Sequence, residues 1–228
     1  MILDFFLWPF LLPLIALFIY CVWRKRSALQ ISGLILLSGI CIVGVYWPLI
    51  SMDFFPFNYI IIKFLLFVFV PILLLKILLK KQFRDILISN GLQKKGMKNS
   101  VFLFLIFLPI MLIFSGALVY LSGNSVQGAL DAGVISFFES FTEEFYFRGL
   151  LFLVLIAYID VRVAYVVSIT SFVLVHPQHL TSFFILSTIV QGILTLEIVR
   201  RSNNLVGAWL LHGANRIFLL LILPFLFG

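Results

Sequence analysis

Three carboxylates and one guanidinium lie in one strongly apolar stretch, the run 138–148 (FESFTEEFYFR). They are Glu139, Glu143, Glu144 and Arg148, and carboxylates of this kind can act in acid–base catalysis. Glu144 and Arg148 are four residues apart, in the order that favours an ion pair on one face of a helix. Glu143 is turned about 100° from Glu144 on such a helix and shares a face with Glu139. We therefore expect a structural ion pair between Glu144 and Arg148, beside a less neutralised Glu143 that suits general acid or base catalysis.

A histidine, His176, ends a later apolar run at the sequence FVLVHPQH (residues 172–179). Phe172 lies four residues before it, so the two rings share one face of a helix, and Pro177 is expected to break or end that helix. Taken alone, such a histidine is more often a satisfied residue at a helix end than a catalyst. We include His176 in the candidate site and leave out the more peripheral His179.

A second histidine, His212, lies inside the last apolar run of the chain. Asn215 and Arg216 follow it by three and four residues, so both can share its face of a helix. An interhelical hydrogen bond that only joins two helices is the alternative interpretation of His212 with Asn215. The presence of the other ionisable residues in the same short chain favours a convergent site. The candidate catalytic set is Glu143, His176, His212 and Asn215.

The composition shows which elements must position these side chains. Hydrophobic residues make up 63% of the 228 residues and charged residues 11%, whereas soluble domains are near a quarter charged. The mean hydropathy is +1.21. The chain is therefore expected to be an integral membrane protein. Because a charge at the centre of a lipid-facing helix costs about 2.5–3.5 kcal/mol on insertion scales, the ionisable residues must face the bundle interior, where such groups are usually functional.

Apolar runs of about 20 residues, long enough to cross a bilayer, recur along the whole sequence. They predict an all-α fold, a polytopic membrane helix bundle of about eight transmembrane helices, in a single integral membrane domain over 1–228. The N-terminal spans fall within 1–125, and the site falls in the catalytic region 126–228. The expected spans are 3–23, 29–50, 58–79, 100–122, 129–157, 161–176, 181–199 and 204–226.

Basic residues are distributed asymmetrically among the loops between these spans. The loops after the first, third, fifth and seventh spans carry Lys or Arg, and those after the second, fourth and sixth carry neither. Positive loops stay in the cytoplasm, so the odd-numbered loops are predicted to be cytoplasmic, in the membrane of a prokaryotic cell. The net charge of +7 is explained by these loops, so no nucleic-acid partner is expected. The two cysteines indicate neither a disulfide framework nor a thiol-ligated metal.

The motifs together resemble a known family. Glu143 and Glu144 with Arg148, then Phe172 with His176, then His212 with Asn215 are similar, in order, to the three signatures of the CPBP family, CAAX-prenyl-protease-like and bacteriocin-processing or immunity membrane proteins also called the Abi group. The resemblance covers residues 130–220. It implies an intramembrane endopeptidase of glutamic type, in which Glu143 with His176 activates a water and His212 with Asn215 stabilises the oxyanion.

One position departs from the family pattern, which places Asn or Asp four residues after the last histidine. Here that position is Arg216, and Asn215 precedes it. The family was long described as metalloproteases, so zinc bound by Glu143, His176 and His212 is the alternative to a site without a cofactor. The chain lacks a His-Glu-x-x-His motif, and we favour the metal-free site.

The sequence leaves the substrate open. The resemblance implies membrane lipid and a peptide, or a lipidated or anchored protein, as partners. Two other functions use the same intramembrane Glu and His residues: a proton-coupled transporter, and a non-catalytic immunity or scaffold protein that binds a partner in the cavity. Against the transporter, no internal repeat with matched broken helices is visible.

Overall fold

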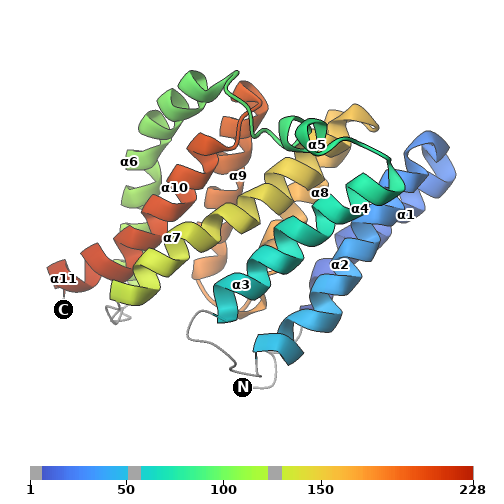
Figure 1. Ribbon diagram of the computed structural model, residues 1–228. Coiled ribbons are helices and arrows are strands. Elements are labelled where there is room, and N and C mark those ends of the chain that lie inside the picture. The colour runs from blue at the N-terminus through green and yellow to red at the C-terminus, as the bar shows by residue number, and fades with distance from the viewer. Residues whose placement is uncertain (1–6, 51–57, 123–129, 228) are drawn as a thin grey trace.

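The computed structural model describes residues 7–50, 58–122 and 130–227, and within these ranges the chain is a bundle of helices without strands (Figure 1). This confirms the predicted all-α membrane bundle. The first residues of the expected span 3–23, and residue 129, lie outside the described residues. The helical bounds otherwise follow the apolar runs closely; the run 29–50, for example, forms α2 (Leu29–Ile50).

The first half of the bundle consists of three long apolar elements. A 3₁₀ turn, Trp8–Phe10, leads into α1 (Leu11–Arg24), which packs against α2. The expected span 58–79 is one continuous helix in three parts: α3 (Asn58–Phe64), a π-helical turn (Leu65–Phe69) and α4 (Val70–Leu78). A short helix, α5 (Phe83–Ser89), lies in the polar stretch that follows.

The second half contains the region predicted to carry the site. After α6 (Met97–Ser122), the long run 129–157 folds as α7 (Leu130–Glu144), a ten-residue π-helical segment (Phe145–Val154) and a final 3₁₀ turn (Leu155–Ala157). The remaining elements are α8 (Val161–Leu174), a 3₁₀ turn (Pro177–His179), α9 (Phe184–Ser202), α10 (Val206–Ile217), a π-helical turn (Phe218–Ile222) and α11 (Leu223–Phe227).

Local chemistry explains several of these bounds. The side chain of Asp160 caps α8 by accepting a hydrogen bond of 2.8 Å from the backbone N–H of Arg162. After α8 the chain turns at Pro177, which cannot continue a helix. Asn203, in the left-handed conformation (φ 52°), ends α9. These breaks set where His176 and the start of α10 lie.

Four helices in the described part of the chain are long and apolar enough to cross a membrane. Two further apolar helices, Trp8–Arg24 and Val161–Leu174, are shorter, while α7 carries the buried carboxylates and α9 ends in charged residues. The bundle is therefore that of a membrane protein, and the number of eight spans stays a prediction. The four spans are Arg26–Tyr46, Tyr59–Leu78, Met97–Leu121 and Val206–Phe225.

The loops that carry the basic residues lie together at one end of the bundle, the upper end in Figure 1, where α5 also lies. Three contacts between these loops, or between the helix ends beside them, tie them to one another. Gln30 donates to the carbonyl of Leu78 (2.6 Å), Gln93 donates to the carbonyl of Asn203 (3.1 Å), and the ammonium of Lys81 lies 5.9 Å from the ring centroid of Tyr158. The alternating charge pattern thus corresponds to one physical end of the molecule.

Helix α7 and its π-helical continuation occupy the middle of the bundle, in contact with α3, α8, α9 and α10. Tyr146 and Phe147 at the start of the π-helical segment are fully buried. Helix α10 approaches α7 closely, because a side chain at Gly213 would collide with the ring of Phe137. This close approach, which only glycine permits, brings the residue before Gly213, His212, against the carboxylates of α7.

Candidate active site

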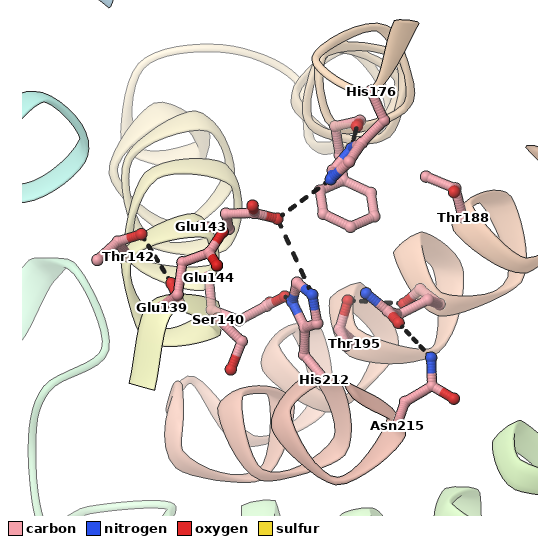
Figure 2. Close-up of polar contacts among 12 residues, drawn as sticks. Glu139, Ser140, Thr142, Glu143, Glu144, His176, Thr188, Thr195, His212 and Asn215 are labelled. Atoms are coloured by element: carbon pink, nitrogen blue, oxygen red, sulfur yellow. Dashed lines mark hydrogen bonds and ion pairs between the residues drawn. The ribbon is translucent and has the colours of Figure 1, made fainter. Parts of the chain in front are cut away.

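Glu143, His176 and His212 converge at the centre of the bundle (Figure 2). Glu143 Oε2 lies 3.5 Å from His176 Nε2 and 3.9 Å from His212 Nε2. Glu143 comes from the last turn of α7, His176 from the turn after α8, and His212 from the middle of α10. All three side chains are buried, so one carboxylate oxygen faces two imidazole nitrogens in a site shielded from bulk water.

Each histidine is held by a contact at its other ring nitrogen. His176 Nδ1 lies 2.8 Å from the backbone carbonyl of Phe172, one helical turn earlier, and His212 Nδ1 lies 2.8 Å from Glu144 Oε1. A carbonyl or a carboxylate accepts, so both Nδ1 atoms donate their hydrogen there. Both Nε2 atoms are thereby directed at Glu143. Neither Glu143 Oε2 nor His212 Nε2 has a hydrogen-bond partner among the described residues.

Glu144 and Arg148 lie on the side of α7 that faces α9 and α10. Glu144 Oε2 is 3.2 Å from Arg148 Nε, at the i,i+4 spacing in the sequence. Arg148 also donates to the carbonyl of Gly192 (3.3 Å), and its guanidinium lies 4.0 Å from the ring centroid of Phe172. Glu144 therefore has two partners, and the one that the sequence does not suggest, His212, belongs to the site itself.

Lys63 is a site residue that the sequence analysis missed. Its ammonium contacts the carboxylate of Glu139 and lies 2.5 Å from Glu143 Oε1, and Tyr59 donates a hydrogen bond of 2.7 Å to Glu139. The expectation that Glu143 would be less neutralised was therefore wrong, because α3 supplies a cation. The available signal was a single lysine within the apolar run NYIIIKF of α3.

Asn215 lies away from this centre. Its Nδ2 donates a hydrogen bond of 2.8 Å to Gln191 Oε1 on α9, and in Figure 2 it lies on the far side of His212 from Glu143. Its Oδ1 is buried and makes no hydrogen bond within the described chain. The structure thus brings Glu143, His176 and His212 together and directs Asn215 towards α9.

Two cavities meet at His176. The larger, about 490 Å³, is lined by Lys63, Glu139, Glu143, His176 and Arg216, among others. The smaller, about 190 Å³, is lined by His176, His179, Asn215 and Arg216, with apolar walls from Phe184 and Leu219. Because both cavities include His176 and Arg216, a chain lying in them would pass beside His176, with Glu143 in the wall of the larger cavity.

The zinc alternative requires at least three side chains placed to hold one ion. Among the residues that the structure describes, no three His, Cys, Asp or Glu side chains are arranged to hold a metal ion. In addition, the Lys63 ammonium lies against one oxygen of Glu143. A divalent cation at Glu143 would have to share that carboxylate with a positive charge 2.5 Å from it.

Comparison with known proteins identifies the region that carries this site. Residues 125–218 match the family model described as Rce1-like, type II CAAX prenyl endopeptidase. No curated protein and no solved structure matches the chain. The matched segment covers less than half of the chain and contains Glu143, His176 and His212, so the region that carries the site is similar to this family of endopeptidases.

Proposed function

We propose that the chain hydrolyses a peptide bond in a membrane-associated substrate by a glutamic-type mechanism, with Glu143 and His176 activating a water. The observation that carries this proposal is the convergence of Glu143 Oε2 with two imidazole Nε2 atoms, at 3.5 and 3.9 Å. Glu143 Oε2 has no hydrogen-bond partner among the described residues. This oxygen is therefore free to accept a proton from a single bound water molecule. A buried carboxylate held beside that water is suited to general base catalysis.

The proposed reaction has two proton transfers. Water adds to the scissile carbonyl carbon as its proton passes to Glu143 Oε2, with His176 Nε2 beside it, and the carbonyl oxygen becomes an oxyanion. The proton is then delivered to the leaving amine nitrogen as the carbon–nitrogen bond breaks, which leaves a new carboxyl group and a free amine. Glu143 thus acts first as base and then as acid.

His212 is the proposed oxyanion donor. Its Nδ1 donates to Glu144 (2.8 Å), so a protonated ring would present Nε2–H towards the reacting carbonyl. A buried carboxylate behind an imidazole both orients the ring and stabilises its cationic form. A preorganised donor in a water-poor site is usually the largest electrostatic contribution to catalysis. Asn215, bonded to Gln191, would have to turn from α9 to assist.

We further propose that the reaction uses no metal. Lys63 supports this, because its ammonium contacts both Glu139 and Glu143 and so places a positive charge where a metal would otherwise bring one. A carboxylate pair that is buried without a cation would be strongly unfavourable. Lys63 therefore supplies a counter-ion to both acidic side chains within the bundle.

The proposed orientation places the odd-numbered loops in the cytoplasm, in a prokaryotic cell membrane, with membrane lipid and a peptide, or a lipidated or anchored protein, as partners. The basic loops gather at one end of the bundle, as the positive-inside rule requires of cytoplasmic loops. The larger cavity is lined by Tyr46, Tyr59 and Gln178, which lie near the other ends of the same helices. The site would then open towards the non-cytoplasmic side.

The test of the proposed function compares membrane-associated peptides from cells with wild-type protein, Glu143→Gln and Glu197→Gln. Glu197 is a matched control, because it pairs with Arg200 and Arg201 at the end of α9, away from the site. Cleavage products should be present in wild type and in Glu197→Gln, and absent in Glu143→Gln. Unchanged products in Glu143→Gln would refute the mechanism.

Two other outcomes would support the alternative functions. Solute flux that depends on Glu143, without any peptide product, would support a carrier. Protection or partner binding that survives loss of both Glu143 and His176 would support an immunity or scaffold role.

A further inference from the structure

Arg216 differs from every other buried or half-buried cation of the site in having no counter-ion. Lys63 lies against two carboxylates, and Arg148 pairs with Glu144. Arg216, half-buried on α10, makes no hydrogen bond or ion pair within the part of the chain that the structure describes. A cation within a membrane bundle normally finds a partner, so the unpaired guanidinium requires an explanation.

The position of Arg216 indicates where its partner would come from. It lines both the 490 Å³ cavity that holds Glu143 and the 190 Å³ cavity beside it, so it lies where the two meet. Both carboxylates that line the larger cavity are already engaged, since Glu139 and Glu143 contact Lys63 and Glu143 also faces the two histidines. Among the described residues, therefore, no unengaged carboxylate lines either cavity beside Arg216, and an anion bound from outside the chain would supply its partner.

We propose that Arg216 is a specificity-determining residue that binds a carboxylate of the peptide substrate. A guanidinium presents two parallel N–H groups that match the two oxygens of a carboxylate. The smaller cavity supplies the neighbouring surface, since Phe184, Leu219 and Leu220 form an apolar wall next to Ser187 and Thr188. The substrate would thus carry a carboxylate close to the cleaved bond and an apolar side chain beside it.

This inference rests on the proposed peptide hydrolysis, and it goes further by assigning the chemistry of one substrate group. That group is either the C-terminal carboxylate of the substrate or the side chain of an acidic residue. Replacing Arg216 should therefore weaken binding of acidic substrates alone. Loss of a hydrogen-bonded pair with a charged group corresponds to roughly a tenfold to hundredfold change in affinity.

The experiment uses the full-length protein in detergent and two pairs of quenched fluorescent peptides that contain a farnesylated cysteine. One pair ends after three apolar residues as a free acid or as an amide. The other pair ends in an amide and carries Asp or Asn immediately after the cysteine. Turnover is measured with wild type, Arg216→Gln and Arg216→Lys, and with Arg200→Gln as a matched control, because Arg200 is exposed and bonded to Glu197. Binding of the same peptides is measured by fluorescence anisotropy in a Glu143→Gln background, which separates recognition from cleavage.

The expected result is that one acidic peptide of a pair binds at least tenfold more tightly than its neutral partner. Arg216→Gln should abolish that preference, mainly through KM, Arg216→Lys should keep part of it, and Arg200→Gln should leave it unchanged. The pair that shows the preference identifies which carboxylate is bound.

Two outcomes overturn the assignment. One is equal binding of the acidic and neutral forms, at any level of affinity. The other is a uniform loss of kcat on all four peptides in Arg216→Gln, which would make Arg216 an oxyanion donor. Release of product by wild type supports the protease function independently of these outcomes. An acid preference in the binding assay without any cleavage would support the Arg216 assignment while the hydrolysis fails.

Discussion

The ammonium of Lys63 lies 2.5 Å from Glu143 Oε1, and the two residues are 80 positions apart in the chain. The same ammonium contacts Glu139, so one lysine from α3 holds two successive carboxylates of one face of α7. The other oxygen of Glu143 is thereby directed at His176 and His212. Through this contact α3, which lies outside the matched family segment 125–218, becomes part of the candidate active site.

The first prediction concerns Lys63. Lys63→Met should lower kcat/KM at least a hundredfold, because Glu143 loses the contact that orients it and two buried carboxylates are left without a cation. Lys63→Arg should restore part of the activity. The control is Lys76→Met, because Lys76 is exposed on the same helix. In the double variant Lys63→Met with Glu139→Gln, thermal stability should recover more than turnover. The second substitution removes the repulsion between the two carboxylates, but it does not restore the contact that orients Glu143. Full activity in Lys63→Met would show that the lysine has no part in positioning Glu143.

The second prediction concerns Glu144, which joins Arg148 and His212. Glu144→Gln should destabilise the protein by about 3–5 kcal/mol, because it leaves a buried guanidinium without its counter-ion, and should also reduce turnover. Glu197→Gln removes two exposed ion pairs of the same kind and should cost at most about 1 kcal/mol. Thermal unfolding in detergent, measured without substrate, checks both values. Equal stability of the two variants would mean that the Glu144–Arg148 pair does not stabilise the bundle.

The third prediction concerns metal removal. Since Lys63 lies against Glu143 Oε1, treatment of the purified protein with a chelator should leave its hydrolytic activity within about twofold of the untreated value, a negligible energy difference. Elemental analysis of the same sample should find zinc well below one ion per chain. Stoichiometric zinc, with activity lost on chelation and restored only by adding zinc, would establish a metalloprotease.

The fourth prediction concerns orientation. Gln178 lines the larger cavity and is exposed, and Lys95 is exposed in the basic stretch between α5 and α6. In a background with Cys21 and Cys41 replaced by Ala, a membrane-impermeant maleimide added to intact cells should label Gln178→Cys and not Lys95→Cys. Permeabilised cells, in which both should react, provide the control. Labelling of Lys95→Cys alone in intact cells would invert the proposed orientation.

The sequence by itself determined the class of the protein and much of its local structure. Its apolar composition requires a membrane bundle, because no soluble core of this size could bury so many hydrophobic side chains. The bounds of α2 follow from the length of its apolar run, and the ion pair between Glu144 and Arg148 follows from helical spacing. The order of the motifs with Glu143, His176 and His212 was sufficient to indicate the protease family. Each of these inferences uses composition, the order of motifs along the chain or the fixed spacing within one helix, and none depends on how the helices pack.

Only the tertiary structure decided which residues meet across helices. Lys63 reaches Glu143 from α3, His212 is held by Glu144 from α7, and Asn215 turns to Gln191 on α9. These contacts depend on how each helix is rotated and how far it is shifted along its neighbours. The π-helical segment Phe145–Val154, which changes the rotation per residue directly after the two glutamates, makes that rotation harder still to infer. Periodicity assigns a side chain to a face, but only the packing of whole helices determines what that face contacts.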